Sequence, residues 1–480
     1  MNPSSALVNR IWRLCTLLRK DGVTYQQYVN EITYLIFLKM MQERGLEDRL
    51  PVACRWSRLL QPGGDLLGAY KEILKGLRSA PSAEGNLAIV FSDATTIVRD
   101  ENNLRALIEA IDELPWYDNG RDNFGDIYEG ILERNAEESK RGAGQYFTPR
   151  VVVDAVVTAM RPQPGETVQD PAAGTGGFLI GADEYVRRQS SDSIGSRMRP
   201  RPKPLRFVAM ENVPDTYRLL LMNLTLHEVD TGEIYLGDTL SKDHLKLQAA
   251  DLVLSNPPFG PAGGRPTRDD LEFTAAVSNF QLPFVEHCLK ALKPGGRAAI
   301  VVPDNVLFED GRARDLRRYM LDEFHLHTLL RLPAGIFYAA GVKTNVLFIA
   351  KPLHQEDRRT WVYDLRSNMP TFGKSAPLRD AALAEFLAFY GERSDGSDRK
   401  GLAANATGAR FREFGREDLA SRDDDLDIVW LKDAGTSPED DLTDPAAIAA
   451  AMSSHLRLAI TTLDEIAATL KQTEAAERDD

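Results

Sequence analysis

The chain has 480 residues, of which 43% are hydrophobic and 27% charged, and it carries a formal net charge of −13. This composition excludes collagen-like and disordered chains. No apolar run reaches the roughly 18 residues of a membrane span. The length predicts roughly two to four domains. The first residues carry no secretory signal pattern, and Cys15, Cys54 and Cys288 lie far apart, so we expect a cytoplasmic location and no metal site.

The first 115 residues predict helices. Apolar residues recur there at three- and four-residue spacing, as at Leu14, Leu17 and Leu18. The pair Asp21-Gly22 predicts a break between two such helices. A polar segment that contains aromatic residues follows up to Gly144. We therefore expect a helical N-terminal domain over residues 1–140.

From about residue 145 the patterns of strands and helices alternate, which is typical of an α/β fold with a doubly wound, mostly parallel sheet. A helix is expected from Pro149 to about Met160, with Thr148 as its N-cap. The last two predicted strands lack a crossover helix between them, which favours an antiparallel hairpin. We expect this domain to span 141–375, with strands at 167–170, 207–210, 252–254, 299–302, 328–330 and 345–349.

The stretch from Arg187 to Arg206 is strongly basic. It holds seven basic residues and a single acid, Asp192. We expect a loop there, either simply solvated or in contact with phosphate or a partner protein.

The C-terminal region, 376–480, is mixed in pattern and acidic at its end. Residues 421–480 hold 5 basic and 15 acidic residues, a net of −10, which leaves −3 for residues 1–420. The acidity therefore does not exclude local basic patches in the rest of the chain. Apolar spacing over roughly 446–471 predicts a long amphipathic helix, which either packs on its own domain or docks on a partner.

A glycine-rich turn, Asp170-Pro171-Ala172-Ala173-Gly174-Thr175-Gly176-Gly177, lies between a predicted strand and a helix. Glycines let a backbone approach a ligand closely, so the turn indicates a cofactor site, although such turns are also purely structural in many proteins. Glu211 lies 35 positions after Gly176 and ends the next predicted strand. An acid there typically binds ribose hydroxyls, and Asp238 after the third strand is placed to accept a hydrogen bond from an adenine amino group.

The tetrapeptide Asn256-Pro257-Pro258-Phe259 follows a predicted buried strand directly. An exocyclic amine on a base is a poor nucleophile because its lone pair is delocalised into the ring. The Asn256 side-chain oxygen and the Pro257 carbonyl could each accept one of its N–H groups, which points the lone pair at an electrophile. The prolines make this geometry rigid, and Phe259 offers a face for stacking. The alternative is a rigid turn with a core phenylalanine.

A second candidate segment, Gln145-Tyr146-Phe147-Thr148-Pro149, precedes a predicted helix. A helix N-terminus favours an anion, so the carboxylate of a cofactor could lie here. Aromatic packing beneath the edge of a sheet is the alternative interpretation.

These motifs, in the order 145–149, 170–178, 237–240 and 256–260, resemble those of the γ-order amino-methyltransferases. Within that class the chain is most similar to the methylation (M) subunits of type I restriction–modification systems, over about residues 10–370. The resemblance implies a Rossmann-like methyltransferase domain after an all-α domain, with S-adenosylmethionine as donor. The implied acceptor is the N6 amine of adenine in double-stranded DNA, reached by base flipping and serving phage defence.

The resemblance also implies roles for single residues and for partners. Glu211 would bind the donor's ribose, Asp238 its adenine ring, and Asn256 the target base. Implied partners are a specificity (S) subunit, a second M subunit and a nuclease–translocase (R) subunit. The implied cofactor-binding residues are Gln145, Tyr146, Phe147, Thr148, Asp170, Ala172, Gly174, Thr175, Gly176, Gly177, Glu211 and Asp238, and the implied catalytic residues are Asn256, Pro257, Pro258 and Phe259.

Three other functions are alternatives to adenine methylation of DNA. Cytosine C5 methylation needs a cysteine nucleophile, typically after proline, whereas the three cysteines follow Leu, Ala and His. Protein glutamine methylation uses a similar tetrapeptide, usually with tyrosine in the fourth position. A non-catalytic scaffold that binds S-adenosylmethionine is disfavoured because the segment from Asn256 to Phe259 is intact.

Overall fold

The computed structural model describes residues 3–19, 24–61, 64–78, 90–91, 94–118, 121–122, 124–138, 147–192, 203–337, 342–353, 359–370, 372, 378–399, 409–431, 453 and 460. Within these residues, no helix is long and apolar enough to cross a membrane. The chain divides into two compact units. Unit 1 comprises Met1–Gly142, Pro162–Thr239 and Asp243–Gln248, and unit 2 comprises Ala143–Arg161, Leu240–Lys242 and Ala249–Asp480. The division into domains 1–140, 141–375 and 376–480 stays a prediction, and the C-terminal helix expected at 446–471 lies outside the described residues, apart from Ser453 and Ile460.

The N-terminal part of unit 1 is helical, as expected. Its helices are α1 (Pro3–Arg19), α2 (Tyr25–Glu43), α3 (Leu66–Arg78), α5 (Glu101–Asp112) and α6 (Phe124–Glu138). Thr24 begins α2 with a capping box, in which its hydroxyl accepts from the backbone N–H of Gln27 at 3.2 Å. The predicted break at Asp21-Gly22 lies outside the described residues, between the end of α1 at Arg19 and the start of α2 at Tyr25.

The rest of unit 1 contains three parallel strands that pair in the order β3-β4-β5. The predicted strands are confirmed as β3 (Thr167–Asp170) and β4 (Arg206–Glu211), and β5 (Ile234–Leu236) follows. The helices α8 (Gly177–Asp192) and α9 (Pro214–Leu226) connect them. Because the three strands are parallel, their carboxyl ends lie at one edge of the sheet.

The described residues of unit 2 form six strands in the order β11-β10-β8-β9-β7-β6. The predicted hairpin is confirmed: β8 and β9 are antiparallel, and β9 is also antiparallel to β7 on its other side. The pairs β6–β7 and β8–β10 are parallel, while β11 was not predicted and runs antiparallel to β10. The bounds are β6 (Ala250–Ser255), β7 (Leu292–Pro303), β8 (His325–Arg331), β9 (Thr344–Ala350), β10 (Thr360–Asp364) and β11 (Phe411–Phe414).

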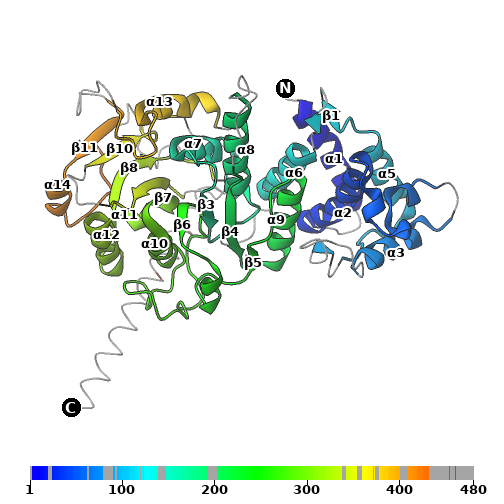
Figure 1. Ribbon diagram of the computed structural model, residues 1–480, viewed down its shortest axis with the longest axis horizontal. Helices are drawn as coiled ribbons and strands as arrows, with labels where there is room; N and C mark the ends of the chain where they lie inside the picture. Colours follow the sequence, from blue (N-terminus) through cyan, green and yellow to red (C-terminus); the bar gives the residue numbers. More distant parts are fainter. Residues whose placement is uncertain are drawn as a thin grey trace, which may run out of the picture. The chain divides into compact units, whose positions relative to one another are not determined.

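Helices cover both faces of the unit 2 strands (Figure 1). On one side lie α7 (Arg150–Met160) and α13 (Asp380–Tyr390), and on the other α10 (Gln281–Lys290) and α12 (Arg312–Glu323). Alternate residues of β9 point to the two faces of the sheet. Leu347 and Ile349 pack in the core with α10 and α12. Phe348, between them, contacts Phe386 and Tyr390 of α13 on the other face. The short helices α11 (Asn305–Phe308) and α14 (Arg416–Ala420) complete the unit. The predicted α/β class, with a mixed sheet and a preceding helical part, is confirmed.

The two ends of the basic stretch 187–206 belong to regular elements, whereas its central part, residues 193–202, lies outside the described residues. Its first residues belong to α8, which continues to Asp192, and its last residue, Arg206, begins β4. Arg187 pairs with Asp183, Arg188 with Glu184, and Arg206 with Glu233. Several of its cations therefore already have carboxylate partners, because helical spacing and strand pairing place acids beside them.

Candidate active site

The glycine-rich turn after β3 has two glycines in the left-handed region, and they differ in their surroundings. Gly174 has φ +55°, and a Cβ there would meet no atom within 4 Å. Gly176 has φ +87°, and its Cβ would lie 2.7 Å from Cδ1 of Leu220 in α9. The first glycine thus leaves room in front of the turn, and the second permits close helix packing.

Side chains from three elements hold the turn in place. Asp170 is buried and accepts from the backbone N–H of Ala172 at 3.1 Å. Thr239 donates its hydroxyl to the Pro171 carbonyl at 2.6 Å. Asn223, buried in α9, donates its amide to the Thr175 carbonyl at 2.8 Å. The sequence did not reveal Asn223, because it comes from a helix 48 positions after the turn.

Glu211, at the end of β4, is tied to the same turn. Its carboxylate accepts from the backbone N–H of Gly174 at 3.0 Å and from that of Val213 at 2.8 Å. Burial raises the pKa of Glu211, and these backbone hydrogen bonds offset part of the rise. A carboxylate has about four acceptor positions, so Glu211 can still accept from a ligand hydroxyl beside Gly174.

Asp238 follows β5, the neighbour of β4 in parallel register. Its backbone N–H donates to Asp243 at 3.2 Å, and its side chain is half-buried. The three predicted acids Asp170, Glu211 and Asp238 therefore follow three adjacent parallel strands at one edge. We name this edge and the glycine-rich turn the donor half, after the role that the resemblance implies for them.

Asn256 follows β6 directly, as predicted, and its amide makes one specific contact. Its Nδ2 donates to the Thr148 hydroxyl oxygen at 2.9 Å. Its Oδ1 is buried and has no hydrogen-bond partner among the described residues. A buried amide oxygen without a donor is unfavourable, so this atom is prepared to accept a hydrogen bond from a ligand.

Thr148 was predicted as the N-cap of the following helix, and this prediction is wrong. The N-cap of α7 is Pro149, without a side-chain hydrogen bond, and its carbonyl accepts from Val152. The Thr148 hydroxyl binds Asn256 instead. Phe147 is half-buried, whereas Gln145 and Tyr146 lie outside the described residues.

The residues after Asn256 form a tight turn held by the segment 278–281. Gly260 has φ +90°, and its N–H donates to the buried Gln281 side chain at 3.0 Å. The Phe280 N–H donates back to the Gly260 carbonyl at 3.0 Å. Phe259 is only 6% exposed, so most of its ring packs inside unit 2. We name Asn256–Phe259 with Thr148 the acceptor half.

A second anchor holds the long connection between β6 and α10. Glu286 of α10 is completely buried, and its carboxylate accepts from three successive backbone N–H groups, those of residues 272–274, at 2.6–3.4 Å. The Thr274 hydroxyl adds a bond of 2.7 Å. A buried carboxylate stabilised in this way makes an irregular segment rigid.

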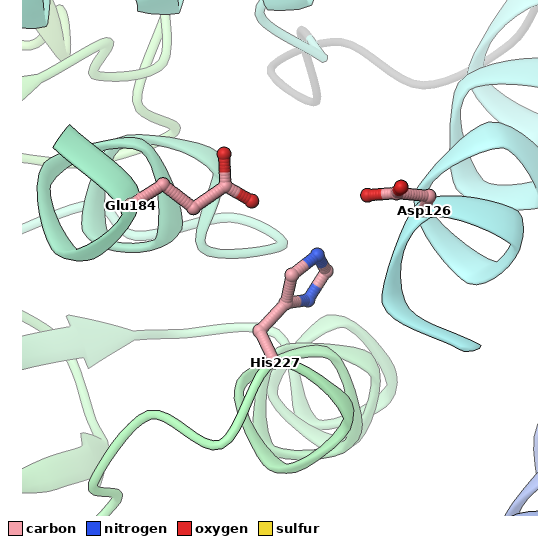
Figure 2. A group of neighbouring side chains, drawn as sticks. All are labelled: Asp126, Glu184 and His227. Carbon is pink, nitrogen blue, oxygen red and sulfur yellow. The ribbon is translucent and has the colours of Figure 1, made fainter. Parts of the chain in front are cut away.

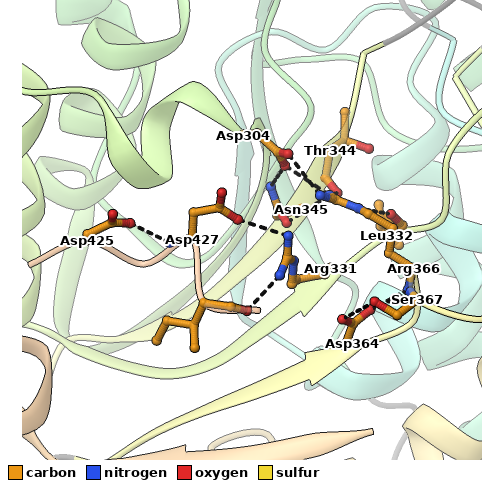
Figure 3. Close-up of polar contacts among 11 residues, drawn as sticks. Asp304, Arg331, Leu332, Thr344, Asn345, Asp364, Arg366, Ser367, Asp425 and Asp427 are labelled. Atoms are coloured by element: carbon orange, nitrogen blue, oxygen red, sulfur yellow. Dashed lines mark hydrogen bonds and ion pairs between the residues drawn. The ribbon is translucent and has the colours of Figure 1, made fainter. Parts of the chain in front are cut away.

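A network of buried and part-buried charges lies at the carboxyl ends of β7, β8 and β10 (Figure 3). Arg366 makes a two-pronged ion pair with Asp304, with both distances 2.9 Å. It also donates to the carbonyls of Leu332 and Thr344, at 3.1 and 3.0 Å, which are the two ends of the β8–β9 connection. Burial, the largest single influence, would raise the pKa of Asp304, but the charge and hydrogen bonds of Arg366, with smaller contributions from Asn345 and Arg331, together outweigh it and the pKa is lowered.

Family models and relatives match nearly the whole chain. The model described as N-6 DNA Methylase matches residues 119–420, and that described as HsdM N-terminal domain matches residues 7–111. The chain is 43% identical, over 96% of its length and 94% of the relative's, to the type I restriction enzyme StySJI methylase subunit of Salmonella typhimurium. It is 42% identical, with the same coverage, to the EcoKI methylase subunit of Escherichia coli.

Solved structures give the same result. The crystal structure of the EcoKI M protein is 38% identical and superposes with a TM-score of 0.54, covering 95% of both chains. A chain from a structure concerned with complex assembly and conformational transition of the type I R-M system has a TM-score of 0.69 at 26% identity, covering 97% of this chain and 98% of that one.

Proposed function

Since the chain belongs to the N-6 DNA methylase family, as a methylase subunit of a type I restriction enzyme, we propose that its donor half binds the methyl donor and its acceptor half the target amine. Members of this family are S-adenosylmethionine-dependent, and the chain is a site-specific adenine DNA methyltransferase. The observation that carries the residue assignment is the buried Oδ1 of Asn256 without a partner.

In the donor half, the open space at Gly174 fits a ligand that approaches the backbone. When bound, S-adenosylmethionine supplies a methyl group on a sulfonium centre. Glu211 accepts from the ribose hydroxyls, and Asp238 accepts from the adenine amino group. We assign Gln145, Tyr146 and Phe147 to the methionine portion of the donor, while Asp170, Ala172 and Thr175 to Gly177 shape the turn.

In the acceptor half, Asn256 Oδ1 and the Pro257 carbonyl accept the two N–H groups of the adenine N6 amine. This frees the nitrogen lone pair to attack the methyl carbon of a bound donor: one N–C bond would form as one S–C bond breaks, and the excess proton on N6 would then pass to solvent. The hydrogen bonds strengthen as the nitrogen gains positive charge, which lowers the barrier. Pro257 and Pro258 keep both acceptors in place.

The N6 amine lies inside the base stack, so the target adenine must leave the double-stranded DNA before it can reach Asn256. Membership of a type I restriction–modification complex supports three partners. We assign sequence recognition to a specificity subunit, a second copy of the methylase subunit to the same complex, and DNA cleavage to a nuclease–translocase subunit.

A transfer assay with tritiated S-adenosylmethionine tests the function. Duplex DNA should be labelled on adenine in the presence of the specificity subunit, and a translation release factor should remain unlabelled. Labelling of the release factor would identify a glutamine methyltransferase, and binding of the donor without labelling of either substrate would identify a scaffold.

The two glycines of the turn should respond differently to alanine. We expect Gly174→Ala to weaken S-adenosylmethionine binding at least about tenfold, because its methyl group enters the open space, with left-handed strain of roughly 1–2 kcal/mol. Gly176→Ala combines similar strain with a clash against Leu220. Its free energy of unfolding should therefore fall by roughly 1–3 kcal/mol more than that of Gly174→Ala. Calorimetry measures the affinity of each variant for S-adenosylmethionine, and thermal unfolding measures its stability. Greater stability loss in Gly174→Ala would contradict this division of roles.

Thr148 is a positioning residue for Asn256. In Thr148→Val the amide loses its acceptor, so we expect the rate of transfer to fall about 10–100-fold, with the KM for S-adenosylmethionine nearly unchanged. Thr148→Ser keeps the hydroxyl and should restore most of the rate. A large rise in KM with an unchanged rate would show that Thr148 serves the donor alone.

A further inference from the structure

Three helices of unit 1 bring together side chains that the methyl transfer does not use. Asp126 of α6, Glu184 of α8 and His227, which follows α9, each place one ligand atom within 4.8 Å of the other two. Figure 2 shows the ring of His227 with Nε2 directed toward the space between the two carboxylates. These side chains belong to neither the donor half nor the acceptor half.

The hydrogen bond on the other side of the ring determines which nitrogen carries a proton. His227 Nδ1 lies 2.9 Å from the backbone carbonyl oxygen of Asn223. A carbonyl oxygen can only accept, so Nδ1 must be the donor. Nε2 is buried and has no hydrogen-bond partner among the described residues. In a neutral ring, its lone pair therefore faces the carboxylates.

This arrangement lacks a positive charge at its centre. Two carboxylates and one lone pair all direct electron density into the same space, which is unfavourable unless a cation lies between them. Arg188 donates to Glu184 at 2.9 Å, but it does so from an exposed side chain, where such pairs contribute little. We propose that Asp126, Glu184 and His227 bind a divalent transition-metal ion of the zinc type.

The donor set selects this class of ion. One imidazole nitrogen and two carboxylates suit Zn²⁺, with water in the fourth position, whereas Mg²⁺ and Ca²⁺ prefer oxygen alone. Ligand atoms about 2.0–2.2 Å from Zn²⁺ lie roughly 3.4 Å apart, so binding draws the group together, and the exposed Asp126 side chain can make this movement. Gly125 leaves room for the ring, since a Cβ there would come within 2.6 Å of Nε2.

The ion would join the N-terminal helices to the sheet of unit 1. It connects α6 with α8, which begins at the glycine-rich turn, and with the end of α9. Asn223 links the two sites directly, because its carbonyl accepts from His227 while its side chain donates to Thr175 in the turn. A carbonyl partner of this kind is typical of metal-binding histidines.

Titration calorimetry on the full-length, chelator-treated chain tests the proposal with Zn²⁺ as the probe. We expect one equivalent to bind at this site and to raise the melting temperature by several degrees. Asp126→Asn should weaken that binding at least about tenfold and remove the shift in melting temperature. Glu109→Gln, which alters an exposed carboxylate on α5 outside the group, should bind as the wild type does.

His227→Gln should also abolish the site, and circular dichroism reports whether this variant folds. If it does not fold, Asp126→Asn decides alone, since that side chain is exposed. Other histidines and the cysteines are the same in wild type and Asp126→Asn, so metal held elsewhere cancels in the comparison. Equal Zn²⁺ affinity in both proteins, or no stoichiometric binding to the wild type, overturns the proposal, as does equally tight binding of Mg²⁺.

Discussion

Asn256→Ala is expected to lower the rate of methyl transfer about a thousandfold, while the affinity for S-adenosylmethionine stays within a factor of about two. The substitution removes the buried Oδ1 that would accept the N6 amine, and removing one such pre-positioned group typically lowers a rate by about 10²–10³. Donor affinity persists because the acids and the glycine-rich turn remain. Single-turnover transfer to duplex DNA with the specificity subunit gives the rate, and calorimetry gives the affinity.

Asn256→Asp provides the matched control. A carboxylate keeps an oxygen that can accept from the amine, and the Thr148 hydroxyl can donate to it, so this variant should retain clearly more activity than alanine. If Asn256→Ala transfers methyl groups at a rate near that of the wild type, the amine-holding role is wrong. If it instead loses donor binding, the residue serves the donor half.

Arg366→Met is expected to lower the free energy of unfolding by about 3–5 kcal/mol, because it leaves the largely buried Asp304 carboxylate without its cationic partner, with the Asn345 amide still donating to it. The same change releases the carbonyls at both ends of the β8–β9 connection. Urea unfolding followed by circular dichroism measures the difference. Arg359→Met removes an exposed pair with Glu413 and should change stability by less than about 1 kcal/mol.

The effect of Arg366→Met should depend on pH in a defined direction. The pKa of Asp304 is lowered in the folded protein, so its contribution is fully present above the unfolded value of about 3.9 and is lost as the pH falls through the lower folded value. In the variant, burial without the guanidinium favours the protonated acid. The two proteins should therefore approach each other in stability as the pH falls from 7 toward about 3. A difference independent of pH would show that Arg366 acts only through its backbone contacts.

The sequence alone was sufficient to predict those elements that are specified by contiguous residues. Strands β3, β4, β6, β7, β8 and β9 were predicted from short segments of the sequence, and each is present. The glycine-rich turn and the Asn256 tetrapeptide were placed correctly at strand ends, because contiguous residues specify a turn through their own backbone preferences. Their order along the chain also identified the family.

Contacts between distant residues are what only the tertiary structure decided. Thr148 had every local property of an N-cap, yet its hydroxyl binds Asn256, which lies 108 positions away. The same holds for Asn223 behind the glycine-rich turn, Gln281 at Gly260, and Arg366 between two strand connections. No sequence pattern connects these residues with their partners, because the number of residues between the two depends on the lengths of the intervening helices and strands. Packing alone brings such side chains together, and burial then makes each hydrogen bond specific, since an unpaired polar group inside the protein is costly.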